Sequence, residues 1–272
     1  MIGAPANGDS HVRFEGVRMS FGQRLVFESL TCGFQRGRIS VILGGSGSGK
    51  STILRLIGGL VRSQSGKIFV EDDEISGLSE RRLYDVRRKI GMMFQGGALL
   101  DSLNVFDNLA FPLREHTSLN EREIDAEVHE RLAAVGMSNV DALLPGELSG
   151  GMLKRAALAR AIIRKPQILL CDEPFSGLDP ASTKRIERLL VRMNRDLGVT
   201  MIVVSHHIPS TMRMADRVLL ILPHTRVEGS PAELRANSDP EVTSFLDENA
   251  ADTDEELPSS PSASGATAGS PR

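Results

Sequence analysis

The sequence has few of the residues that mark secreted or membrane-spanning proteins. Its 272 residues include only two cysteines, one tyrosine and no tryptophan. Two cysteines exclude a disulfide-rich scaffold, and we interpret Cys171, inside the apolar run 168–172, as a buried free thiol in a reducing compartment. No apolar run approaches the ~18 residues of a membrane span, and Met1 to Ser10 lacks the features of a secretion signal. We therefore expect the chain to remain in the cytosol.

Neither positive nor negative charge is in large excess. The formal net charge is -3, so the chain has no general basic field for nucleic acid, which is not an expected partner. With 40% hydrophobic and 25% charged residues, the composition is that of an ordinary globular protein of one or two domains. The function must therefore be inferred from local motifs.

Residues 44–52 fit the pattern G-x-x-x-x-G-K-[ST] of a phosphate-binding loop. They follow an apolar, strand-like run (39–43) and precede a helical one, which is the context that this motif requires. Backbone N–H groups and the helix N-terminus would hold a nucleotide's β-phosphate, Lys50 would neutralise charge and Ser51 would bind Mg²⁺. The alternative is a glycine-rich turn without a ligand. The loop consists of Gly44, Gly45, Ser46, Gly47, Ser48, Gly49, Lys50, Ser51 and Thr52.

A second apolar run, residues 168–172, ends in the carboxylates of Asp172 and Glu173. In a nucleotide site Asp172 would complete the Mg²⁺ shell, directly or through water, and Glu173 would orient and deprotonate the attacking water. Gln95 and His206 each follow another predicted strand. Gln95 could reach Mg²⁺ or water, and His206 could donate to the γ-phosphate or to Glu173. A plain sheet edge is the structural alternative for the carboxylate pair.

Ser149, Gly150 and Gly151 open another predicted helix, so free N–H groups and the helix dipole form a second anion site. One chain would then have two phosphate sites for one nucleotide. A head-to-tail homodimer resolves this excess, with Ser149 of one chain closing over the ATP bound at Lys50 of the other.

Strands and helices alternate along the chain, which predicts an α/β fold with a mostly parallel sheet covered on both faces. A helical block occupies the middle of the chain, and residues 118–121 are a candidate capping box for one of its helices. One apolar face of that helix is formed by Ile124, Val128, Leu132 and Val135.

The composition changes near the C-terminus. Pro240 can begin a short helix that places Val242, Phe245 and Leu246 on one face, and a helix this short needs another surface to rest on. Six of the ten residues from Asp247 to Glu256 are acidic, and the remainder is rich in Ser, Ala, Gly and Pro. We therefore assign 236–250 as a docking extension and expect 251–272 to be a disordered tail.

The ordered set of motifs resembles the ATP-binding subunit of ABC transporters over about residues 11–235. The resemblance implies a P-loop NTPase (RecA-like) core, a helical subdomain inserted at about 96–160 and an edge β-subdomain. The cofactors it implies are ATP and Mg²⁺.

The same resemblance assigns roles to particular residues. Phe21 would stack on adenine, Gln95 would form the Q-loop, residues 176–179, ending in Asp179, would form the D-loop, and His206 would be the switch histidine. The chain departs from the general pattern at two positions, where Met152 replaces a common Gln and His207 replaces a common Asp. We expect Met152 to leave activity intact, and His207 could weaken hydrogen bonds around the D-loop.

Within this superfamily the chain is similar to the ATPases of Mla phospholipid transport systems, in residues 94–108, 148–152 and 172–179 and in its C-terminal extension. The similarity implies a homodimer of ATPase subunits at the cytoplasmic face of the inner membrane. It also implies three partners: an integral membrane permease dimer, a periplasmic MCE-domain lipid-binding protein and a cytoplasmic STAS-domain protein.

Two of these contacts can be placed on the sequence. Residues 98–111 would meet the permease through Leu99, Leu100 and Phe106, with packing inside the helical subdomain as the alternative. By the same similarity, the face of the C-terminal helix would rest on the opposite ATPase subunit or at its junction with the STAS-like partner. Docking on its own body is the alternative.

Two other functions compete with phospholipid transport. The motifs that hydrolyse ATP carry no information about cargo, so an ATPase for an amino acid or organic solvent transporter would look alike. A soluble ABC ATPase of DNA repair, translation or cofactor assembly is a further class. A repair protein would insert a long coiled coil and a translation factor would carry two cassettes, and the sequence has neither.

Overall fold

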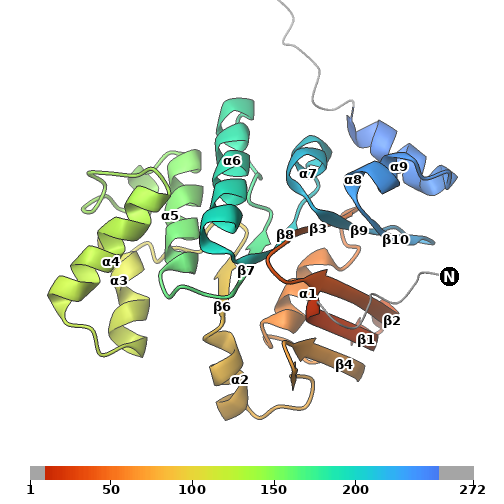
Figure 1. Cartoon of the computed structure of the whole chain (residues 1–272), viewed down its shortest axis with the longest axis horizontal. Helices are drawn as coiled ribbons and strands as arrows, with labels where there is room; N and C mark the ends of the chain where they lie inside the picture. The colour runs from red at the N-terminus through yellow and green to blue at the C-terminus, as the bar shows by residue number, and fades with distance from the viewer. Residues whose placement is uncertain (1–9, 251–272) are drawn as a thin grey trace, which may run out of the picture.

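A computed structural model describes residues 10–250 and shows a mixed α/β fold built on two sheets (Figure 1). The larger sheet has six strands in the order β10-β9-β3-β8-β7-β6, all parallel except the edge strand β10. This confirms the predicted fold class, and the strand order brings the ends of β3, β7 and β8 together. The strands are β3 (Ile39–Gly44), β6 (Ile90–Met93), β7 (Ile168–Asp172), β8 (Thr200–Val204), β9 (Arg217–Ile221) and β10 (Arg226–Gly229).

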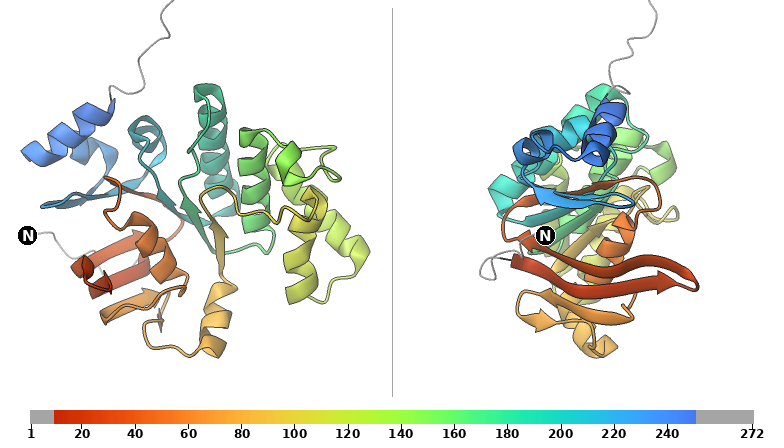
Figure 2. Two further views of the ribbon diagram at one scale, coloured as in Figure 1. Left: turned by 180° about the vertical axis from the view of Figure 1, so that it is seen from behind. Right: turned by 90° about the vertical axis from the view of Figure 1, so that its right-hand side faces the viewer.

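The smaller sheet is antiparallel, with the order β2-β1-β4-β5. Figure 2 shows this sheet stacked below the larger one, with α1 between them. One apolar core unites the inner faces of both sheets with the buried side of α1, and it includes Phe14, Ile42, Ile53 and Leu170. The elements are β1 (Ser10–Phe21), β2 (Arg24–Gln35), β4 (Ser65–Val70), β5 (Asp73–Glu74) and α1 (Lys50–Ile57).

A second core covers the opposite face of the six-stranded sheet. Successive residues of a strand point to opposite faces, so Val41 and Leu43 of β3 belong to this core while Ile42 belongs to the other. Its helical side is α5 (Gly150–Ile162), α6 (Pro180–Leu197) and α7 (Ile208–Met214). Cys171 lies in this core and is fully buried without a disulfide, as predicted.

Between β6 and β7 the chain forms a set of helices that project to one side of the sheets (Figure 1). The predicted capping box at 118–121 is wrong. Asn120 is the N-cap, because its side chain accepts from the backbone of Glu123 and the carboxylate of Glu123 accepts from the N–H of Asn120 at 2.8 Å. The helices of this region, with α2 before it, are α2 (Glu80–Arg87), α3 (Val105–His116), α4 (Glu121–Ala134), η1 (Pro145–Glu147) and α5.

The C-terminal extension folds back on its own chain. After α8 (Pro231–Arg235), α9 (Pro240–Ala250) packs against α7 and α8, with Val242 fully buried and Leu246 nearly so. The predicted apolar face is therefore present, and it packs on the chain's own body, which is the alternative that the sequence left open. The expectation of a disordered tail at 251–272 lies outside the described residues. No helix within residues 10–250 is long and apolar enough to cross a membrane.

Candidate functional site

The phosphate-binding loop connects β3 to α1 and packs closely against β2. Gly47 and Gly49 have φ angles of 77° and 97°, a region that side chains disfavour. A Cβ on Gly49 would lie 2.5 Å from both Val26 and Phe27, so β2 leaves room only for glycine. The backbone is thereby held in a tight turn at the N-terminus of α1, where N–H groups are free to bind an anion.

Lys50 is buried at the base of this loop and is 8% exposed. Its Nζ donates to the carbonyl oxygens of Gly44 and Gly45, at 2.8 and 2.9 Å. Burial lowers the pKa of Lys50, and the nearby carboxylates of Glu173 and Asp172 partly oppose that shift. The buried hydroxyl of Ser48 has no hydrogen-bond partner among the described residues, so the loop retains a polar group suited to a phosphate oxygen.

The end of β7 meets the start of α1 through a hydrogen bond. Ser51 Oγ donates to Asp172 Oδ1 at 2.9 Å, although 121 positions separate the two residues. Within residues 10–250 no group of three or more His, Cys, Asp or Glu side chains could hold a metal by itself. A divalent ion at this point would therefore need the hydroxyl, the carboxylate and phosphate oxygens together, which is the donor set that Mg²⁺ prefers.

Glu173 follows β7 in a left-handed backbone conformation, with φ 49°. Such a conformation costs about 1 to 3 kcal/mol in a non-glycine residue and persists only where surrounding contacts enforce it. Glu173 as a whole is 8% exposed, and its Oε2 lies 2.8 Å from Nδ1 of His206. This contact is an ion-pair distance without hydrogen-bond geometry, so Oε2 has no hydrogen-bond donor among the described residues.

The backbone of Glu173 is held by residues that the sequence did not single out for this role. Its N–H donates to the carbonyl of Val204 at 2.9 Å. Its carbonyl oxygen accepts from Lys154 Nζ at 3.1 Å and from Ser176 Oγ at 3.0 Å. The sequence placed Ser176 in the predicted D-loop. It gave no indication that Lys154 has a role at the site, because a lysine on a helix usually lies at the surface.

The motif at residues 149–151 is at the surface. Ser149 caps α5 by accepting from the N–H of Met152 at 3.3 Å, and Ser149 and Gly150 are both exposed. Neither forms a hydrogen bond with the phosphate-binding loop of its own chain. Asp179 caps α6 in the same way, and hydrogen bonds from Ser182 and Ala181 hold the pKa of its carboxyl below the ordinary value.

Two predicted site residues stand apart from the rest. Gln95 is exposed and its side chain forms no hydrogen bond with another described residue, so it does not reach Ser51 or Asp172 here. Phe21 is 47% exposed at the tip of the β1–β2 hairpin, which is compatible with a stacking surface. In the same hairpin, Arg24 donates to the carbonyl of Gly47 at 3.0 Å, a link to the loop that no sequence pattern indicated.

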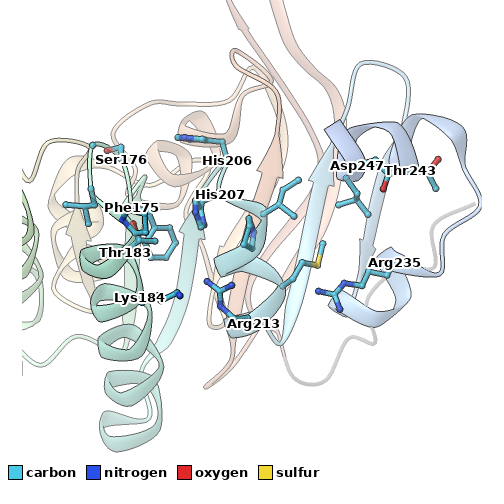
Figure 3. Close-up of a pocket in the computed structure, with 17 residues that line it drawn as sticks. Phe175, Ser176, Thr183, Lys184, His206, His207, Arg213, Arg235, Thr243 and Asp247 are labelled. Atoms are coloured by element: carbon cyan, nitrogen blue, oxygen red, sulfur yellow. The ribbon is translucent and has the colours of Figure 1, made fainter. Parts of the chain in front are cut away.

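His207 lies on a cavity of about 980 Å³ beside His206, between α6, α7 and α9 (Figure 3). Its Nδ1 accepts from the N–H of Ser210 at 3.2 Å and so caps α7, and its ring lies 5.9 Å from that of Phe175. Burial lowers the pKa of His207, and the positive charges of Arg213 and His206 add to the effect. A neutral imidazole thus supplies the capping acceptor in place of the common Asp.

Comparison with known proteins identifies close relatives. Residues 27–176 match the ABC transporter family. Over 237 residues the chain is 44% identical to the intermembrane phospholipid transport system ATP-binding protein MlaF of Escherichia coli (strain K12), covering 87% of this chain and 88% of MlaF. It is 42% identical to the probable ribonucleotide transport ATP-binding protein mkl of Mycobacterium bovis, covering 86% of this chain and 66% of mkl.

Solved structures show the same architecture. The structure of cbiO1 from Clostridium perfringens, part of the transporter complex cbiONQ, matches with a TM-score of 0.77 at 29% identity, over 84% of this chain and 92% of cbiO1. The ATP-binding cassette MJ0796, solved as a dimer in a post-hydrolysis state with ADP and Pi, matches with a TM-score of 0.72 at 28% identity, over 80% and 98%.

Proposed function

Because the chain belongs to the ABC transporter family of ATPases, we propose that it powers the transport of phospholipid between the inner and outer membranes. The observation that carries this proposal is the 44% identity to MlaF, which extends over 88% of that protein. A second relative in Haemophilus influenzae, also named MlaF, has the same identity over 86% of its length.

Ribonucleotide transport is the second candidate, because mkl is nearly as similar, at 42% identity. The match covers only 66% of mkl, so about a third of that protein has no counterpart here. The match to MlaF covers more of the relative, 88% against 66%, and this favours phospholipid as the cargo. ATP-hydrolysing motifs do not touch cargo, so the choice between the two depends on the assembled transporter.

The family binds ATP, and the site described above fits its phosphates. Lys50 and the N–H groups of the loop would bind and orient the phosphates. Ser51 and Asp172, joined by Gln95 when its loop moves inward, would hold Mg²⁺, which would neutralise charge on the β- and γ-phosphates. Glu173 would take the proton from the attacking water, and His206, 2.8 Å from that carboxylate, would orient it.

The exposed position of Ser149 and Gly150 supports a head-to-tail homodimer. These residues form an anion site at the N-terminus of α5 and yet make no bond to the loop of their own chain. We infer that they close over the nucleotide of a second copy. The D-loop, which ends in Asp179, would lie at the same interface.

A surface on the helical side supports docking of a membrane permease. Arg88, Arg160 and Arg164 line a groove of about 140 Å³ with Pro112, between α2, α3 and α5. Arg160 also approaches the carbonyl of Gly97, at 3.4 Å, so a partner in this groove would touch the loop that carries Gln95.

The predicted permease segment divides into two parts. Leu99 and Phe106 pack against the chain's own core, while Leu100 and Phe111 are 43% and 47% exposed and available to a partner. Such docking would place the ATPase at the cytoplasmic face of the inner membrane. An MCE-domain protein and a STAS-domain protein complete the proposed assembly, on the strength of the relationship to MlaF alone.

The test is reconstitution of the full chain with the permease and MCE-type protein from neighbouring genes in liposomes. We expect ATP-dependent transfer of a fluorescent phospholipid and no movement of a radiolabelled ribonucleotide, with Glu173→Gln as the inactive control. Ribonucleotide movement without lipid transfer would establish the second candidate instead.

A further inference from the structure

Lys154 is a buried lysine whose contacts are directed at the catalytic region. It lies in the second turn of α5 and is only 4% exposed, although lysine is almost never buried unless its charge has partners. The hydrogen bonds of its Nζ go to the carbonyl oxygen of Glu173, at 3.1 Å, and to Ser176 Oγ, at 3.0 Å. Burial lowers the pKa of Lys154, while the carboxylates of Glu173 and Asp172 favour its charged form.

These contacts fix the one strained residue of the proposed reaction. Glu173 has φ 49°, and its carbonyl oxygen accepts three hydrogen bonds: from Lys154 Nζ, from Ser176 Oγ at 3.0 Å and from Ser176 N at 3.2 Å. Ser176 belongs to the same turn as Glu173, so it can move with that turn. Lys154 is the donor that comes from a different element, and it ties the turn to α5.

The helix that carries Lys154 also carries Ser149 at its N-cap. Its first turn is closely packed against the D-loop side: a Cβ on Gly150 would lie 3.6 Å from Leu178, and a Cβ on Gly151 would lie 3.4 Å from Ser182. An α-helix is stiff over a turn and a half, so a displacement at Ser149 is transmitted to Nζ of Lys154. The carbonyl of Glu173 would then move with it.

We propose that Lys154 is a positioning residue for ATP hydrolysis, which holds the backbone of Glu173 in its left-handed conformation and couples it to the serine at the start of α5. The coupling rests on the proposed dimer, in which Ser149 faces the nucleotide of the other copy while Glu173 serves the nucleotide of its own chain. Lys154 thereby links the two nucleotide sites through one subunit.

The central variant is Lys154→Met in the full-length chain, which keeps the length of the side chain and removes the donor. We expect kcat for ATP hydrolysis to fall about 100-fold, since small displacements of a catalytic group have effects of this size, while KM and nucleotide binding stay within about two-fold. Lys154→Arg, which restores a donor, should recover part of kcat. Lys67→Met is the matched control, because Lys67 is exposed and its one ion pair among the described residues is with Glu74.

Two further measurements separate positioning from general damage. In a Glu173→Gln background, Lys154→Met should cause no additional loss of residual hydrolysis, because both changes act on the same group. In a tagged mixed dimer, one Lys154→Met subunit should slow hydrolysis while the sites still occlude a fluorescent ATP analogue.

The proposal is overturned if folded Lys154→Met retains kcat within two-fold of the parent, or if nucleotide binding falls in the same proportion as kcat. Hydrolysis by the isolated ATPase is measured without lipid or permease, so failure of phospholipid transport would leave this result unaffected.

Discussion

Ser51 and Asp172 are joined by a hydrogen bond of 2.9 Å between the first turn of α1 and the end of β7. The two residues belong to different predicted motifs, and the parallel order of β3, β8 and β7 places both at the carboxyl edge of the sheet. Open α/β sheets bind their ligands at this edge. The bond therefore brings the predicted phosphate loop and the predicted carboxylate pair into direct contact at this edge.

Glu173→Gln should stop turnover and spare nucleotide binding. The amide keeps the shape of the side chain but cannot accept a proton, so hydrolysis should fall about 10²- to 10⁴-fold. Steady-state ATPase assays and binding of a fluorescent ATP analogue measure the two effects. Glu28→Gln is the control, since Glu28 is exposed and its side chain has no partner among the described residues. Turnover near the parental rate would remove Glu173 from its proposed role.

Lys50→Ala should instead weaken nucleotide binding, because it removes the charge that would face the phosphates. Binding of the same fluorescent ATP analogue measures this effect.

Combined with Ser149→Arg, the Lys50→Ala change tests whether each nucleotide site is shared between two chains. Mixed dimers with one change on each chain keep one intact site, whereas dimers with both changes on the same chain keep none. Dimers selected with two affinity tags should therefore differ in ATP hydrolysis and nucleotide occlusion. Equal activity in the two arrangements would contradict a site shared between chains.

Val242→Asp should destabilise the folded chain. Val242 is fully buried between α9 and the rest of the protein, and an unpaired charge there costs several kcal/mol, so the melting temperature should fall by several degrees. Ser244→Ala, on the exposed side of the same helix, removes only a surface hydrogen bond to Glu248 and should have an effect of about 0.5 kcal/mol or less. If thermal denaturation gave equal melting temperatures for both variants, the docking of α9 on its own chain would be wrong.

Acidic pH should weaken the fold through His11. The pKa of His11 is lowered by burial and by the charge of Arg36, against the opposing effect of Glu71, and its Nδ1 lies 2.6 Å from Thr200 Oγ1. The unfolded chain therefore binds a proton more readily, and stability decreases as pH falls below about 6.5, the ordinary value. Melting temperatures at pH 7.5 and 5.5 should drop more for the parent than for His11→Gln. An equal drop would mean that His11 contributes nothing.

The sequence predicted the parts of the site that depend on short contiguous motifs. The phosphate loop, the carboxylate pair and His206 each follow a strand of the same sheet, so topology brings them together without further information. Lys154 could not be predicted, because only its burial and the hydrogen bonds of its Nζ to Glu173 and Ser176 show that this lysine faces inward. The capping box was misplaced for a smaller reason: Ser118 and Asn120 each have a glutamate three positions later, so the spacing fits both, and only the start of α4 at Glu121 shows that Asn120 is the N-cap.

The position of α1 has a thermodynamic consequence. Because the apolar side of α1 is shared by both sheets, neither sheet can separate from the other without exposing that helix to water. A nucleotide held at the N-terminus of α1 would bind only when this shared core is formed. Its binding free energy would then be added to the stability of the whole chain, and an increase in melting temperature would report the affinity of any nucleotide that the loop accepts.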